Sequence, residues 1–149
     1  MRISRFLAAP VVVAVTLVTA VSAQAPRTFK TRLGTVPVEA ATLKGLMGAS
    51  GEVTAVLTGN RLTVNGTFKG FQSPATVARL HVAPKGQRGP AMLDIPVTKA
   101  TSGMITGDLM LTAIQVDHLV RNRVYIQLYS EKAPEGVLWG WLLPVGAGK

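Results

Sequence analysis

The sequence predicts an all-β domain, an antiparallel β-sandwich or barrel of about eight strands with one short helix. Two observations lead to this fold class. Short segments alternate apolar and polar residues with the period of two that half-buried strands show. Gly, Pro and Asn separate these segments at regular spacing, and the chain of 149 residues contains 15 glycines and nine prolines that can form the turns.

The strands are expected where the alternation is clearest. Gly59-Asn60 is a hairpin signal between two of them. Asn65-Gly66 falls inside an alternating segment and could itself be a turn. The expected strands span 28–33, 52–58, 61–68, 76–82, 91–97, 104–111, 123–129 and 137–143.

Three other segments are expected to leave the sheet. Thr112 and Gln115 have the spacing of a capping box, which predicts a short helix over 112–121. The stretch 37–47 is ambiguous and could hold a turn of helix. Residues 84–90 are rich in Gly, Pro and basic residues, which is typical of a loop.

The first 23 residues have the layout of a secretory signal peptide. Two arginines precede an apolar run over 6–20, and the small residues VSA at 21–23 form a cleavage site. We therefore expect cleavage after Ala23 and a single mature domain over 24–149, either periplasmic or secreted. The alternative is an uncleaved membrane anchor, but a spanning helix needs about 20 apolar residues, more than this run contains.

The composition limits the chemistry that the chain can perform. It has no cysteine and two histidines, which excludes disulfides and leaves few ligands for a transition metal. The seven acidic residues show no spacing diagnostic of paired catalytic carboxylates, and the sequence contains no nucleophile elbow or phosphate-binding loop. We therefore expect a protein that is not an enzyme and has no cofactor or metal.

The chain is strongly basic. Its formal net charge of +9 falls to +7 once the two arginines of the signal peptide are removed. The basic residues are spread along the chain rather than clustered with aromatic residues, which argues against nucleic acid as a partner. An acidic protein or an anionic membrane surface is the expected partner, and a solvated basic surface is the alternative.

The last expected strand, within GVLWGWLLP at 136–144, has two apolar faces. Alternation places Val137, Trp139 and Trp141 on one face and leucines on the other. Only one face can enter the core of a simple sandwich, so the tryptophan-bearing face needs another cover. That cover is either a partner protein or the N-terminal segment 37–47.

Three stretches of the sequence resemble the CHRD domain family, named after the repeats of chordin. They are ATVARLHVAPKGQRGP, SGMITGDLMLTAIQVDHLVRNRVYIQLYS and PEGVLWGWLLP. Their order and spacing follow the family pattern over residues 50–144. The resemblance implies a Greek-key β-sandwich related to the copper/zinc superoxide dismutase architecture, with a polar outer face that could bind a ligand.

The departures from the family pattern fall on one face. Where the family has His-x-His, this chain has RLH at 79–81, and the later histidine position is Tyr129. The Glu, Arg and Gln of the family's last strand are replaced by Val137, Trp139 and Trp141. The face that is polar in relatives is therefore aromatic and aliphatic here.

These observations favour a non-catalytic accessory or structural subunit of an exported complex, docking through the aromatic face. Its partner would be a larger exported or membrane-associated protein, and by analogy with other small basic subunits, a membrane-associated dehydrogenase. The alternatives are a free-standing CHRD-type module that binds a ligand or protein, and a metal-binding protein that uses His81. The candidate interface residues are Trp139, Trp141, Tyr129, Tyr125, Arg79, His81 and Val137.

Overall fold

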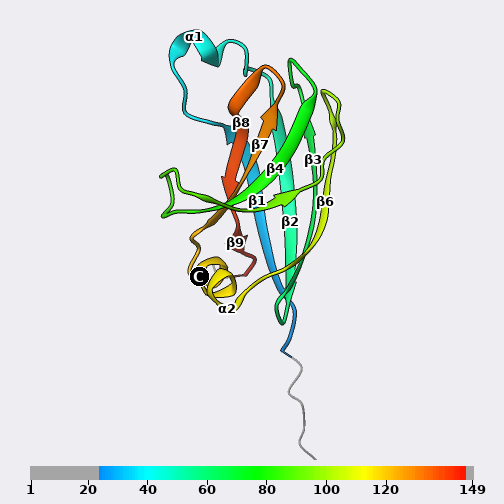
Figure 1. Cartoon of the computed structure of the whole chain (residues 1–149), viewed down its shortest axis with the longest axis vertical. Coiled ribbons are helices and arrows are strands. Elements are labelled where there is room, and N and C mark those ends of the chain that lie inside the picture. Colours follow the sequence, from blue (N-terminus) through cyan, green and yellow to red (C-terminus); the bar gives the residue numbers. More distant parts are fainter. Residues whose placement is uncertain (1–23, 147–149) are drawn as a thin grey trace, which may run out of the picture.

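In a computed structural model that describes residues 24–146, the chain forms one antiparallel sheet that nearly closes on itself (Figure 1). The expected signal peptide lies outside these residues. The strands are β1 (Arg27–Thr35), β2 (Ser50–Thr58), β3 (Arg61–Lys69), β4 (Ala75–Val82), β5 (Ala91–Ile95), β6 (Gly103–Met110), β7 (Val124–Ser130), β8 (Ala133–Trp141) and β9 (Leu143–Pro144). The helices are α1 (Ala40–Leu43) and α2 (Ala113–Val120). The strands follow the order β5-β4-β7-β8-β1-β2-β3-β6, and β9 pairs with β1.

The two ends of the sheet approach each other at β5 and β6. Val97, just after β5, forms an isolated bridge with Ile105 of β6. The all-β class with one short helix near 112–121 is confirmed. The strands join in one nearly closed sheet, and the division into two Greek-key layers stays a prediction.

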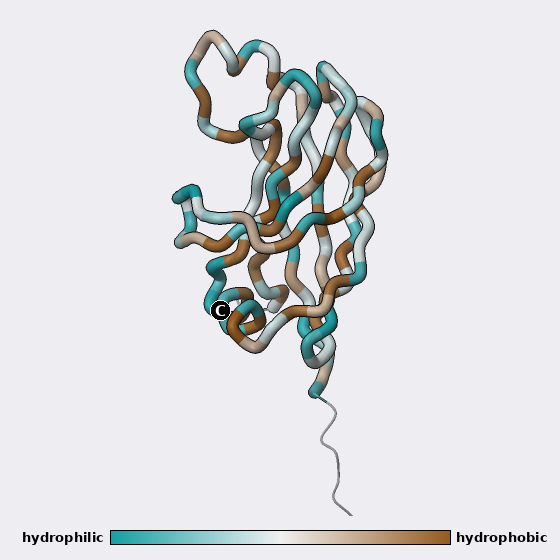
Figure 2. The backbone as a smooth tube through the Cα atoms, in the orientation of Figure 1, coloured by the Kyte–Doolittle hydropathy of each residue, from teal (hydrophilic) through white to brown (hydrophobic). Residues whose placement is uncertain are grey.

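Apolar side chains fill the space that the curved sheet encloses. Hydropathy alternates along most strands (Figure 2), as it must when one face of each strand is buried and the other is not. Fully buried core residues come from both halves of the sheet: Phe29, Leu62, Leu80, Ile105, Ile126 and Leu138. A core of this size explains how a domain without cysteine remains folded.

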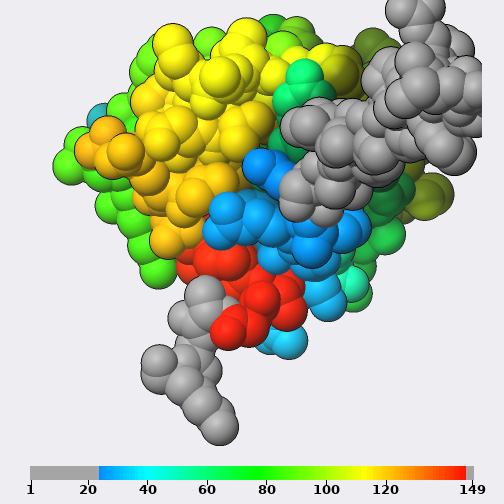
Figure 3. Space-filling model, turned by 90° about the horizontal axis from the view of Figure 1, so that it is seen from below, coloured from blue at the N-terminus to red at the C-terminus, as the bar shows by residue number. Residues whose placement is uncertain are grey.

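Helix α2 begins at the expected capping box. The Gln115 backbone N–H donates to Thr112 Oγ1 at 3.3 Å, and the Thr112 backbone N–H donates to Gln115 Oε1 at 2.9 Å. Leu119 packs into the main core with no exposed surface. Seen from below in Figure 3, α2 (yellow) lies beside the start of β1 (blue), so it covers one end of the sheet's interior.

Two ambiguities of the sequence are settled by the backbone. Residues 37–47 contain the single helical turn α1. Asn65-Gly66 is not a turn but lies inside β3, where Gly66 pairs with Val53 of β2. A Cβ at Gly66 would collide with the backbone carbonyl of Glu52, so the close approach of β2 and β3 requires glycine there.

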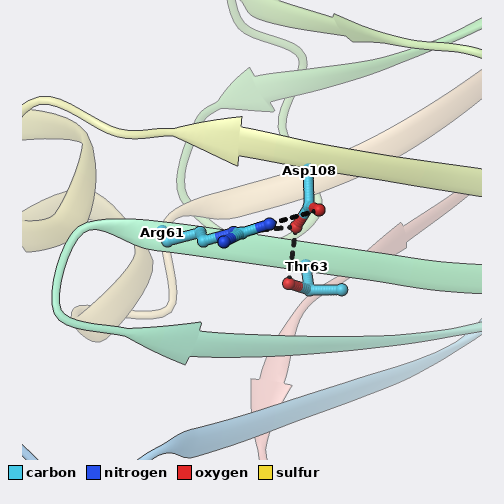
Figure 4. Close-up of polar contacts among 3 residues, drawn as sticks. All are labelled: Arg61, Thr63 and Asp108. Carbon is cyan, nitrogen blue, oxygen red and sulfur yellow. Dashed lines mark hydrogen bonds and ion pairs between the residues drawn. The ribbon is translucent and has the colours of Figure 1, made fainter.

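An ion pair joins β3 and β6 on the outside of the sheet (Figure 4). Arg61 donates to Asp108 through Nη2 at 2.7 Å and through Nε at 3.2 Å, and Thr63 Oγ1 donates to the same carboxylate at 2.7 Å. These hydrogen bonds lower the pKa of Asp108. The group is exposed to solvent, so its main effect is to orient side chains rather than to stabilise the fold strongly.

Candidate functional site

Three neighbouring strands, β4, β7 and β8, carry six of the seven candidate residues on the side of the sheet that faces away from the core. Residues directly paired across antiparallel strands project to the same side. The pairs are Arg79 with Gln127, His81 with Tyr125, Val77 with Tyr129, Gln127 with Trp139, and Tyr125 with Trp141. We call the side chains of Arg79, His81, Tyr125, Gln127, Tyr129, Trp139 and Trp141 the outer face.

One half of the outer face is a packed aromatic cluster. The Tyr125 ring stacks on His81 with centroids 4.8 Å apart and an interplanar angle of 11°. It also contacts Trp141 at 4.7 Å and Trp139 at 5.7 Å. Tyr125 is 1% exposed and Trp141 is 7% exposed. These two residues are therefore too deeply buried to meet a partner directly, whereas Trp139 is half-buried.

The loop between β4 and β5 covers this cluster. Trp141 Nε1 donates to the Ala83 carbonyl at 3.2 Å, and the Gly89 backbone N–H donates to Tyr125 Oη at 3.1 Å. A Cβ at Gly89 would collide with the backbone carbonyl of Val82, so glycine allows the loop to lie this close to β4. Residues 83–90 thus cover the part of this face that Trp141 and Tyr125 form, and Trp139 stays partly exposed.

The segment 37–47, which was the other candidate cover, has a different position. Its Leu46 is buried in the main core, and its Pro37 carbonyl accepts a hydrogen bond from Arg88 of the loop at 3.1 Å. It therefore braces the covering loop at its edge instead of lying over the tryptophans.

The other half of the outer face is an open pocket of about 510 Å³. Arg79 lines this pocket. The Arg79 Nε donates to Asp94 of β5 at 2.8 Å, and the Arg79 guanidinium lies 5.3 Å from the centre of the Tyr129 ring. Arg88 also lines the pocket. The lining residues are Arg79, His81, Arg88, Gly89, Tyr125, Gln127, Tyr129, Pro134 and Glu135.

Contacts with neutral groups hold Arg88 in place. Its Nη1 donates to the Glu135 carbonyl at 3.3 Å and its Nη2 to the Pro37 carbonyl at 3.1 Å. Its guanidinium lies 5.9 Å from the centre of the Trp139 ring, a distance at which cation–π attraction acts. Arg88 is thus oriented while its charge is not neutralised by these partners.

His81 connects the cluster to the pocket. A carbonyl oxygen can only accept, so the 2.8 Å contact between Nδ1 and the Gly89 carbonyl places a proton on Nδ1. In the neutral ring Nε2 then accepts from Tyr129 Oη, also at 2.8 Å. Burial lowers the pKa of His81, and the charges of Arg79 and Arg88 add to that effect. Burial likewise raises the pKa of Tyr129, which favours its hydroxyl as a neutral donor.

The alternative role of His81 as a metal ligand meets competition from these hydrogen bonds. Both ring nitrogens already have partners in the structure. Across residues 24–146, no group of three or more His, Asp or Glu side chains lies close enough together to hold a metal ion.

Comparison with known proteins identifies the domain. A family model, the CHRD domain, matches residues 35–142. The chain belongs to the CHRD domain family. Searches of the curated proteins and of the solved structures gave no match.

Membership of the CHRD family carries some general properties. CHRD domains are binding-type domains that occur in extracellular proteins, and the family is not known for catalysis. The match begins at Thr35, earlier than residue 50, where the sequence resemblance starts. In the part of this CHRD domain that the structure describes, no helix is long and apolar enough to span a membrane.

Val137 is the one candidate that the structure separates from the aromatic cluster. It is 2% exposed and belongs to the main core of the CHRD domain. The reason lies just before it: the pairing of β7 with β8 shifts register, and Gly136 has a φ of 111°. Strict alternation therefore stops at this point, and the face assigned to Val137 from the sequence was wrong.

Sequence reasoning missed Arg88, Gly89 and Gln127 as parts of the site. The available signal for the first two was the loop that resembles the Gly/Pro loop of CHRD domains. Gln127 Nε2 donates to the Glu135 carbonyl at 2.9 Å, so it fixes the rim of the pocket although it is 2% exposed.

Proposed function

We propose that this CHRD domain is an exported, non-catalytic accessory subunit that docks onto a larger exported or membrane-associated protein through its outer face. The observation that carries the proposal is the layered construction of that face. The partly exposed Trp139 packs against buried Tyr125, the partly exposed Tyr129 is hydrogen-bonded to buried His81, and Arg79 lies over the Tyr129 ring. Arg, Tyr and Trp are the residue types that contribute most to binding energy at protein interfaces.

The buried side chains beneath the proposed interface are held rigidly, which favours binding. Trp141, Tyr125 and His81 each have a hydrogen-bond partner in the loop 83–90. Side chains that are already ordered lose less conformational entropy when a partner arrives. In this proposal Trp141 and Tyr125 support the interface, and contact with the partner falls to Arg79, Tyr129, Trp139 and Arg88.

The proposal is tested by recovering the native complex with tagged protein. We expect Tyr129→Ala and Trp139→Ala to lose the partner that wild-type protein retains, because both rings are partly exposed on the outer face. Met104→Ala on β6 is the control, since this side chain is 55% exposed and lies outside the site. Thermal unfolding of each variant verifies that the domain remains folded.

Two results would count against docking. The first is recovery of the same partner with both outer-face variants. The second is isolation of the wild-type protein alone from native membrane and soluble fractions, which would support a free-standing binding module instead. Dehydrogenase activity that co-purifies from membranes in a manner dependent on Tyr129 would support the dehydrogenase class of partner.

A further inference from the structure

The pocket on the outer face contains hydrogen-bond donors that the protein itself does not use. Arg79 is bonded to Asp94 through Nε, and its Nη atoms have no acceptor among residues 24–146. Arg88 is bonded to two carbonyls and retains its Nε–H. A guanidinium has five N–H groups in a planar fork, so each arginine can still bind a second group.

Two of the three charged side chains that line the pocket, Arg79 and Arg88, are positive, and the third is Glu135. The charges that shift the pKa of both His81 and Tyr129 are those of Arg79, Arg88 and Asp94. Asp94 is already paired with Arg79. Arg88 remains without a carboxylate partner in the described part of the chain, where the ion pairs are Arg61–Asp108, Arg79–Asp94 and Arg121–Asp117.

We infer that this pocket binds a carboxylate group on an acidic peptide segment of the partner, with Arg79 and Arg88 as the donors. The inference rests on the proposed docking function and specifies the chemistry of the docking segment. Arginine binds carboxylates through two parallel N–H···O bonds, which gives both strength and a defined orientation. The rings of Tyr129 and Trp139, beneath the two guanidiniums, would contact the aliphatic part of a glutamate or aspartate side chain.

Main-chain chemistry favours a carboxylate over a phosphate. Phosphate sites typically offer several free backbone N–H groups. In this pocket the Gly89 backbone N–H is bonded to Tyr125 Oη, and the Glu135 main chain faces Arg88 and Gln127 with its carbonyl. Recognition in this pocket therefore depends on the side chains of two arginines, whose planar fork matches a carboxylate, without the backbone N–H groups that typical phosphate sites add.

The test uses the exported protein and two short peptides, one of alternating Gly and Glu and one of alternating Gly and Gln. We expect the Glu peptide to bind saturably in a nuclear magnetic resonance titration and to shift the Arg79, Arg88 and Tyr129 side-chain signals. The Gln peptide should bind about tenfold more weakly or less, since it lacks charge-assisted hydrogen bonds.

Variants separate site recognition from general attraction between opposite charges. Arg88→Gln should weaken binding of the Glu peptide about tenfold, and Arg88→Lys should restore part of it, because lysine keeps the charge but loses the fork. Arg123→Gln is the matched control, since it removes one exposed positive charge outside the pocket. The inference is wrong if Arg88→Gln and Arg123→Gln weaken binding of the Glu peptide equally. It is also wrong if the Gln peptide binds as well as the Glu peptide.

Other anions and the native complex complete the test. Tighter binding of inorganic phosphate or of anionic lipid vesicles than of the Glu peptide at Arg79 and Arg88 would overturn the choice of an acidic peptide. Recovery of the native partner by the Arg79→Gln, Arg88→Gln double variant would overturn the inference alone, provided that Trp139→Ala still loses the partner. Recovery with both sets of variants would overturn the proposed docking as well.

Discussion

Replacement of Trp141 by alanine tests whether the loop 83–90 and the aromatic cluster form a second core. Trp141 is 7% exposed and donates a hydrogen bond to the Ala83 carbonyl. Truncation of a buried Trp costs about 3–5 kcal/mol of unfolding free energy. The upper part of this range is expected, because Ala83 is 5% exposed and its carbonyl would lose its Trp141 donor.

The assay is thermal unfolding of the isolated domain followed by circular dichroism. For a domain of this size, a loss of 3–5 kcal/mol lowers the unfolding midpoint by roughly 10–20 °C. Trp139→Ala is the matched comparison. It removes the same side chain from a half-buried position on the same strand, so we expect a loss of only about 1–2 kcal/mol. A Trp141→Ala midpoint equal to that of wild type, or lower stability in Trp139→Ala, would refute the reasoning.

Three further predictions concern the covering loop, His81 and the N-terminus of the exported protein. Gly89→Ala should lower the urea midpoint by an amount equivalent to about 1–3 kcal/mol, since the new methyl group collides with the Val82 carbonyl. The control is Gly86→Ala, where the new methyl group meets no neighbouring atom and only the positive φ of residue 86 causes strain. The free energy of unfolding should fall as the pH drops below the ordinary histidine pKa of about 6.5. The folded state lowers the pKa of His81, so the unfolded state binds more protons in this range. His81→Gln should lose this part of the pH dependence, and a variant with the same pH dependence of stability as wild type would contradict the argument. The exported protein should begin at Gln24, and an intact mass that corresponds to all 149 residues would show that no cleavage occurs.

Much of the strand pattern could be predicted because it depends on local alternation. The hairpin between β2 and β3 turns at Gly59-Asn60, where Thr58 pairs with Arg61 and Gly59 has a φ of 61°. The capping box of α2 is also a local signal, because its two residues lie three positions apart. Such signals act over a few residues, so the sequence alone reveals them.

The beginning of β8 could not be predicted in the same way. Pro134 and Glu135 are exposed, and Gly136 has a positive φ. These residues interrupt apolar alternation, yet Ala133 still pairs with Ser130 across the turn. The pairing arises from the β7–β8 hairpin as a whole rather than from the residues' own preferences.

The cover of the aromatic face was also beyond sequence reasoning. Ala83 and Trp141 are far apart along the chain but share a hydrogen bond. Their contact depends on the path of a loop whose sequence signals irregular backbone but not its direction. The outward orientation of His81 and Tyr129 could be read from alternation, whereas the hydrogen bond between them required the register of β4 and β7.

The position of β1 in the sheet has a consequence for folding. This first strand pairs with β2 along Arg27–Leu33, but its last residues, Gly34 and Thr35, pair with β8, and β9 adds to its other end. The sheet therefore cannot close until the C-terminal strands are available. Pairings between distant parts of a chain form slowly, so we expect the sheet to close late in folding. A circular permutant that begins at β2 and appends β1 after β9 would make the pairs with β8 and β9 local but would make the more extensive pairing of β1 with β2 distant, so its folding rate should fall.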